Sequence, residues 1–178
     1  MRLFVAVSFL LISAAAAELP CHCDAQDPDS LKERSCALCA VVEKAPPDVP
    51  VVLVRDTSLK KPDRWLALPR THSPGMHSFA VLSDSERKDL WTTAIGKAKE
   101  LWGDQWALAY NAEALHTQCH VHVHIGKLLD GVEWGEFKVV DTIDQIPLPG
   151  KDGLWIHPVD GKLHVHLGEQ VTETVLWQ

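Results

Sequence analysis

The sequence predicts an α+β domain in which one antiparallel sheet packs against a single long helix. Short runs of β-branched and aromatic residues are separated by clusters of proline, glycine and aspartate, which is typical of strands joined by turns. One segment, residues 84–102, repeats its apolar residues at helical spacing. The 178 residues suffice for one domain with a proper core, and no internal repeat is evident.

The first 17 residues have the pattern of a secretory signal peptide. Arg2 is followed by an apolar run that ends in small residues before Glu18, and this run is too short for a membrane span. We therefore expect cleavage near Ala17 and an exported protein, periplasmic or extracellular, with no stable membrane anchor. The net charge of −7, without a basic stripe, gives no electrostatic reason to bind nucleic acid.

Five cysteines form two closely spaced pairs and one single position: Cys21 and Cys23, Cys36 and Cys39, and Cys119. The first pair lies in an N-terminal segment, residues 18–34, and the second opens the main domain, residues 35–178. Export favours disulfides, whereas the paired spacing favours zinc, and the sequence leaves both open. We expect Cys119 to be a buried apolar residue.

The first half of the domain contains two predicted strands and the helix. Residues 51–54 and 65–68 are apolar runs on either side of a polar turn, so they predict an antiparallel pair. The helix follows a capping box, Ser83 with Glu86 three residues later, and Gly103 ends it. Further strands are expected at residues 106–110, 119–126, 134–140, 153–157, 162–167 and 172–177.

Three histidines alternate with apolar residues in one predicted strand. Alternation places His120, His122 and His124 on one face, while the apolar residues between and after them point to the core. A row of imidazoles suits nucleophilic chemistry, because one ring attacks while its neighbours fix its tautomer, carry a proton or hold a metal. His22, His77 and His116 are isolated in the sequence, and we expect no role for them.

A weaker second histidine cluster is expected near the C-terminus, in an extension that begins at about residue 127. Residues 153–158 and 162–167 predict a hairpin around an Asp-Gly turn. His164 and His166 share one strand face there, and His157 could lie opposite them, with Glu169 as a carboxylate partner. Such a set could bind a metal or a substrate.

The motif His120-Val121-His122-Val123-His124-Ile125 resembles the signature of the histidine triad (HIT) superfamily, which includes nucleotide hydrolases and nucleotidyl transferases. The upstream order of motifs is similar as well: a Cys-x-x-Cys pair, a strand that ends in Leu66–His72, a helix, and Asn111. The resemblance covers about residues 35–126 and implies a HIT-like antiparallel sheet with one packed helix. It also suggests a homodimer.

The resemblance implies a role for each matching residue. His122 would be the nucleophile that attacks phosphorus and carries a covalent nucleotidyl group until water releases it. His124 would orient and balance the phosphate, and the Thr117 hydroxyl would contact the leaving group. Substrate-binding positions would be Asp56, Asn111 and Gln118. The loop at residues 111–118 departs from the family because it lacks the usual glycines.

Metal-bearing members of the superfamily suggest one structural zinc ion in this chain. The implied ligands are Cys36, Cys39, His72 and His120, which would form a closed tetrahedral set. An oxidising compartment would instead join Cys36 to Cys39, or pair each with Cys21 or Cys23.

The sequence therefore favours an exported HIT-type phosphohydrolase or nucleotidyl transferase that cleaves a small nucleoside phosphate derivative. One alternative is a non-catalytic metal-binding protein, because the chain has ten histidines and four paired cysteines. The other is a hydrolase similar to CDP-diacylglycerol pyrophosphatase, which shares the superfamily.

Overall fold

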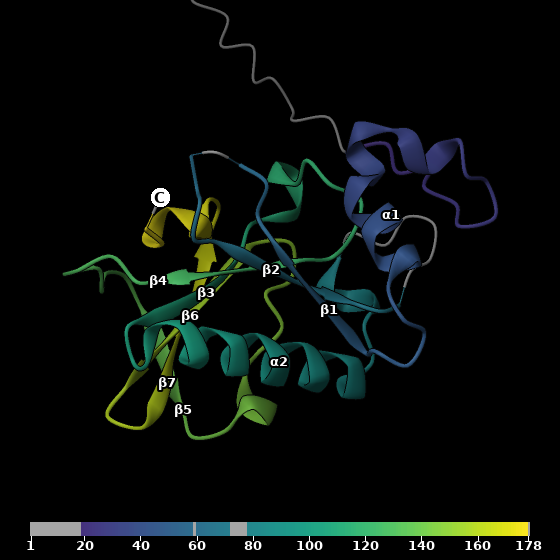
Figure 1. Ribbon diagram of the computed structural model, residues 1–178. Helices are drawn as coiled ribbons and strands as arrows, with labels where there is room; N and C mark the ends of the chain where they lie inside the picture. The colour runs from purple at the N-terminus through teal and green to yellow at the C-terminus, as the bar shows by residue number, and fades with distance from the viewer. Residues whose placement is uncertain (1–18, 59, 72–77, 178) are drawn as a thin grey trace, which may run out of the picture.

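The computed structural model describes residues 19–58, 60–71 and 78–177. These residues form an α+β domain with one seven-stranded antiparallel sheet in the order β1-β2-β4-β3-β6-β7-β5. Helix α2 crosses one face of this sheet, while α1 and the C-terminal segment lie on the other side (Figure 1). The predicted signal peptide and His72 lie outside the described residues. Within the described residues, no helix is long and apolar enough to cross a bilayer.

The strands follow the apolar runs closely. Their bounds are β1 Val51–Arg55, β2 Trp65–Pro69, β3 Trp106–Tyr110, β4 Val123–Lys127, β5 Phe137–Val140, β6 Gly153–Val159 and β7 Lys162–Glu169. The predicted C-terminal hairpin is present as β6 and β7. Asp160 and Gly161 both adopt positive φ at its tip, which a two-residue hairpin turn requires.

Helix α2, Asp84–Trp102, has the predicted bounds and the predicted capping box. The Ser83 hydroxyl accepts from the Glu86 backbone, and the Glu86 carboxylate accepts from the Ser83 backbone. Gly103 ends the helix at φ 60. The buried side of α2 packs against one sheet face in a core that includes Leu90, Trp91, Ala94, Leu108, Val123, Ile125 and Ile156.

The opposite face of the sheet is covered in pieces. Helix α1, Ala37–Lys44, packs Val42 against Leu66 and Leu68 at the β1–β2 end. The 3₁₀ helix η6, Thr172–Val175, packs with Leu176 against Trp155 and Ala109 at the centre. A pocket lies between α1 and η6, above β2 and β4.

Two local predictions were wrong, and one helix was not expected. Residues 119–122 precede β4 and are not part of it, so His120 and His122 belong to a connecting segment. Residues 172–177 contain η6 in place of a strand, joined to the sheet only by a bridge from Leu176 to Leu128. Helix α1 was not expected, because its eight residues carry too short a pattern to distinguish a helix from a strand.

Candidate active site

The three neighbouring histidines lie on the sheet face opposite α2 and are all buried. His124 is in β4, where it pairs with Leu66 on β2 and Ala109 on β3. Only 1% of His120 and 7% of each of the other two is exposed. The alternate side chains Val121, Val123 and Ile125 pack in the core beneath α2. The imidazoles are therefore held between the sheet and the pieces that cover it, rather than displayed to solvent.

One hydrogen bond fixes the tautomer of His122. Its Nδ1 lies 2.8 Å from the His120 carbonyl oxygen, and because a carbonyl only accepts, Nδ1 carries the proton. The lone pair of the neutral ring is then on Nε2. Burial lowers the pKa of His122 below 6.5. The ring is therefore neutral at neutral pH, with an unprotonated Nε2, which is the form that a nucleophile needs.

His120 contacts the end of the neighbouring strand. Its Nε2–H donates to the carbonyl of Pro69 at 2.8 Å. This bond ties the segment before β4 to the last residue of β2. Since His120 in turn accepts from His122 through its carbonyl, it positions the central ring.

A buried ionic network lies beside His124. Glu173 in η6 has a carboxylate oxygen 2.5 Å from both Lys61 Nζ and Arg64 Nη1, and 3.8 Å from His124 Nδ1. Arg64 is 1% exposed and also donates to three backbone carbonyls of residues 173–177. This network fixes the C-terminal segment next to the histidines.

The network sets the charge states of its members. Burial alone would raise the pKa of Glu173, but His124, Lys61 and Arg64 lower it to about 2. Burial lowers the pKa of His124 well below 6.5, and repulsion from the protonated form of His122 acts in the same direction. Glu173 opposes this shift. Near neutral pH the site therefore holds two neutral imidazoles beside an ionised carboxylate with two cationic partners.

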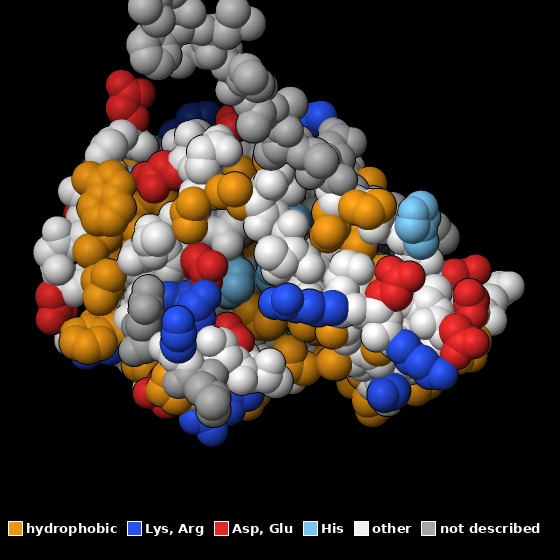
Figure 2. All heavy atoms as spheres, turned by 90° about the horizontal axis from the view of Figure 1, so that it is seen from above, with side chains coloured by type: hydrophobic (Ala, Val, Ile, Leu, Met, Phe, Trp, Pro, Cys, Tyr) orange, Lys and Arg blue, Asp and Glu red, His pale blue; other side chains and the backbone are white. Residues whose placement is uncertain are grey.

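A pocket of about 530 Å³ opens onto these groups. All six side chains that the sequence assigns to catalysis and substrate binding line it: Asp56, Asn111, Thr117, Gln118, His122 and His124. Helix α1, the β1–β2 loop and η6 supply other walls. The basic side chains of Arg34, Arg55 and Lys61 also line the pocket. Figure 2 shows histidine side chains at the bottom of a hollow on this face, next to basic and acidic groups.

Several pocket side chains also hold the walls together. The Asn111 amide oxygen accepts from the Glu173 backbone at 3.1 Å and from the Thr172 hydroxyl at 3.2 Å. The Gln118 amide donates to the Arg34 carbonyl at 2.9 Å and accepts from the Leu38 backbone at 3.2 Å. Both predicted substrate-binding amides thus anchor segments that are distant in sequence.

Sequence reasoning missed three residues of this site. His116, which was expected to have no role, lines the pocket, with its Nε2 2.9 Å from the Asn111 carbonyl and its ring 5.4 Å from that of His122. The signal in the sequence that could have predicted this position was its proximity to the motif, because His116 lies six residues before His122. Lys61 and Glu173 belong to no local motif, since they meet across 112 positions of the chain.

The cysteines form two disulfides, Cys21–Cys119 and Cys23–Cys36, and leave Cys39 as a buried free thiol in the described residues. Burial raises the pKa of Cys39 to about 11. Cys119 is buried as expected, but it was not expected to form the disulfide that ties residue 21 to the segment before the histidines. Disulfides are typical of an oxidising compartment, as expected for an exported chain.

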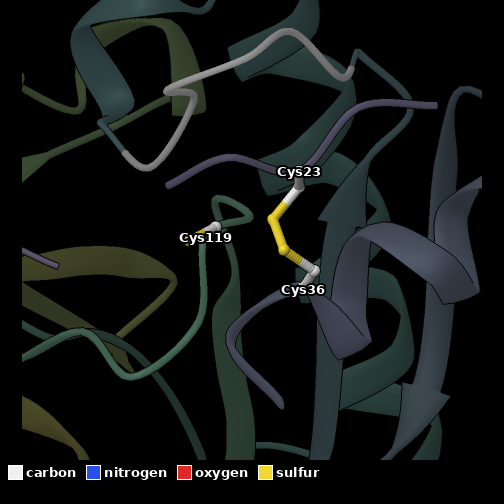
Figure 3. A group of neighbouring side chains, drawn as sticks. All are labelled: Cys23, Cys36 and Cys119. Carbon is white, nitrogen blue, oxygen red and sulfur yellow. A yellow bond between two sulfur atoms is a disulfide. The ribbon is translucent and has the colours of Figure 1, made fainter. Parts of the chain in front are cut away.

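Among the described residues, two of the ligands predicted for zinc, Cys36 and His120, are engaged otherwise. The sulfur of Cys36 is bonded to Cys23, and His120 donates its Nε2 proton to Pro69. The sulfurs of Cys23, Cys36 and Cys119 do lie within 4.8 Å of one another, so this cluster could bind a metal once reduced (Figure 3). The physical reason for the difference is that oxidation consumes the thiolates that zinc needs.

The second histidine cluster is also formed, at the far end of the same sheet face. His157 and His164 are directly opposite each other on β6 and β7, as predicted. The carboxylate beside them is that of Glu133, not Glu169, whose carboxylate accepts from the Trp155 indole at 3.1 Å. Burial lowers the pKa of His157 to about 4.

Comparison with known proteins provides no assignment: no family model matches the chain, and no curated protein matches it.

Proposed function

We propose that the pocket at residues 116–124 is the active site of an exported phosphohydrolase or nucleotidyl transferase of the HIT type, with His122 as nucleophile. The observation that supports this most strongly is the convergence of the six residues suggested by the sequence resemblance on one pocket. They come from the β1–β2 loop, the segment after β3 and the start of β4. A storage site for metal would not need this combination of hydroxyl, amide and carboxylate groups.

In the proposed reaction, His122 Nε2 attacks the phosphorus of a nucleoside phosphate derivative. A P–N bond forms, the bond to the leaving group breaks, and the leaving group departs with its electron pair and takes up a proton from water. Water then attacks the phosphorus of the adduct and releases a proton to solvent, and the electron pair of the P–N bond returns to Nε2. The hydrogen bond from Nδ1 to the His120 carbonyl keeps the lone pair on Nε2 for the first step.

The remaining groups suit a phosphate and a sugar. Lys61 and Arg34 supply positive charge at the pocket wall, in a protein that is acidic as a whole. The exposed Thr117 hydroxyl is available to the leaving group, and the carboxylate of Asp56 is of the type that accepts from ribose hydroxyls. The pocket volume of about 530 Å³ is in the range of small-molecule sites.

The test is a turnover assay on the disulfide-bonded chain without its first 17 residues. The panel would contain a nucleoside phosphoramidate, a dinucleoside polyphosphate and CDP-diacylglycerol. We expect His122→Ala to abolish release of the nucleoside monophosphate, while the control His22→Ala, an exposed histidine outside the pocket, behaves as wild type. Equal turnover by wild type and His122→Ala, or no turnover of any substrate by wild type, would overturn the proposal. Preference for CDP-diacylglycerol would select the pyrophosphatase-like alternative.

A further inference from the structure

A second group of chemically active side chains lies outside the pocket, where β6, β7 and β5 end the sheet. One ligand atom from each of Glu133, His157 and His164 lies within 4.8 Å of the other two. Glu133 contacts His164 Nδ1 directly and lies 3.8 Å from His157 Nε2. None of these three residues lines the pocket of His122.

His166 offers a third nitrogen beside this group. Its Nδ1–H donates to the Trp134 carbonyl at 3.0 Å, so the lone pair of the neutral ring is on Nε2. That Nε2 lies 3.4 Å from His157 Nε2. Two ligand nitrogens on one tetrahedral Zn²⁺, each about 2.1 Å from the ion, are separated by about 3.4 Å. The two rings thus already have the spacing of a metal-bound pair.

The imidazoles are held rigidly before any ion binds. His166 stacks on Trp155 with ring centroids 3.6 Å apart, and His164 stacks on Phe137 at 4.3 Å. His157 is 3% exposed, and its ring also stacks on Trp155, with ring centroids 5.1 Å apart. Fixed rings lose little conformational freedom on binding, which favours affinity.

The local charge and access also favour a cation. Glu133 and His157 line a surface pocket of about 360 Å³ whose wall includes the carboxylates of Asp104 and Asp130. An ion can therefore reach the ligands from solvent through an acidic opening. Within the described residues, Glu133 itself is paired only with histidines, so it keeps its negative charge available when these rings are neutral.

We propose that Glu133, His157 and His164, with His166 as fourth donor, bind one divalent transition-metal ion, with Zn²⁺ as the best match. Three imidazoles and one carboxylate suit Zn²⁺, whereas Mg²⁺ and Ca²⁺ prefer oxygen ligands. The bound ion joins the loop that contains Glu133 to the β6–β7 hairpin. The site is independent of the proposed chemistry at His122.

The test is calorimetric titration of Zn²⁺ into the metal-free, oxidised chain without an affinity tag, at tens of micromolar protein. Wild type should bind one equivalent. His164→Ala should weaken Zn²⁺ binding by at least about 100-fold, and Glu133→Gln should weaken it by at least about 10-fold. The matched control is Glu136→Gln, an exposed carboxylate of the same loop, which should change the affinity by less than about twofold.

Far-UV circular dichroism of each metal-free variant would check its fold, and Glu133→Gln keeps the test valid if His164→Ala is misfolded, because Glu133 is half-exposed. Co²⁺ bound by wild type should give the visible absorption of a tetrahedral nitrogen site. Three results would overturn the proposal. They are no Zn²⁺ binding by wild type, Zn²⁺ affinity in both ligand variants equal to that of wild type, and Mg²⁺ binding by wild type as tight as that of Zn²⁺. None of these results depends on turnover at His122.

Discussion

The two histidine clusters lie on the same face of one sheet, but their surroundings give them different chemistry. In the segment just before β4, burial and a backbone acceptor produce a neutral His122 with a bare Nε2, beside a carboxylate already neutralised by Lys61 and Arg64. At β6 and β7, the carboxylate of Glu133 contacts His164 directly and lies 3.8 Å from His157, and it has no cationic partner other than histidine among the described residues. Between them, Trp155 and η6 fill the face with apolar atoms.

The difference shows how the partner of an imidazole decides its role. A carbonyl acceptor on Nδ1 leaves the lone pair of His122 on Nε2, whereas several lone pairs that converge with a carboxylate favour a metal. Cross-strand pairing places one histidine of each cluster on this face, in a continuous row formed by Leu66, His124, Ala109, Trp155 and His166.

The largest expected effect separates the two clusters by activity. His122→Ala removes the proposed nucleophile, so turnover of the preferred substrate should fall at least about 1,000-fold. Zn²⁺ titration of the same variant should still show one equivalent. Steady-state kinetics and calorimetry on one preparation provide both readouts. Loss of both properties together would mean that the clusters are not independent.

The second effect concerns the covalent attachment of the pocket to the N-terminal segment. Replacing both Cys21 and Cys119 by serine opens a cross-link with a sequence separation of 98, which should lower the free energy of unfolding by about 4.7 kcal/mol. Replacing Cys23 and Cys36 opens a separation of 13, with an expected loss of about 3 kcal/mol. Urea unfolding measures both. A larger loss for the second pair would contradict the chain-entropy explanation.

The third effect tests the charge network of the pocket. Glu173→Gln leaves the buried Arg64 without its carboxylate, and we expect a loss of about 3 kcal/mol in unfolding free energy. The control Glu100→Gln removes a carboxylate that is 64% exposed and pairs with Lys97 on α2, so it should change stability by less than about 0.5 kcal/mol. Equal effects of the two changes would show that the network is not structural.

The fourth effect applies to the other cluster. Zn²⁺ at 100 times its dissociation constant should stabilise wild type by about 2.7 kcal/mol, because the ion binds the folded chain. His164→Ala should lose this gain while its metal-free stability stays close to that of wild type. Thermal melts with and without Zn²⁺ measure the difference. Equal stabilisation of both proteins would place the ion elsewhere.

The smallest effect is the pH dependence of turnover. An ordinary histidine is half protonated near pH 6.5, which would halve the rate there. Burial lowers the pKa of His122 below this value, so kcat/KM should retain more than about half of its pH 7.5 value at pH 6.5. The substrate must have a phosphate that does not titrate between about pH 5 and 8. A kcat/KM at pH 6.5 below half of its pH 7.5 value would contradict a buried neutral nucleophile.

The fold was predictable where the pattern was long or well bounded. The helix at residues 84–102 carried both a capping box and a glycine stop, and its bounds were correct. The hairpin at β6 and β7 was correct because an Asp-Gly turn sits between two apolar runs. The short helix α1 and the 3₁₀ helix η6 were not predictable, since tertiary packing decides the conformation of such short segments.

The pocket was predictable in part for a different reason. Its histidines form a local motif, and the sequence resemblance supplied Asp56 and Asn111. Glu173 was not accessible in this way, because its partners Lys61 and Arg64 lie more than a hundred residues away. Similarly, Glu133 could not be distinguished from Glu169 as the partner of the second cluster, since only the path of the loop brings Glu133 to His164. The cysteine pairing was likewise open until the chain path was known.

The central claim is that His122 Nε2 is the nucleophile of this sheet face, and capture of its adduct tests that claim most directly. The preferred substrate would be mixed with wild type and with His122→Ala, quenched at alkaline pH because the P–N bond is acid-labile, and measured by intact-protein mass spectrometry. We expect wild type to gain the mass of one nucleotidyl group, with fragmentation locating it at His122, and the variant to gain none. Turnover without an adduct under rapid quenching, or an adduct on another residue, would contradict the account.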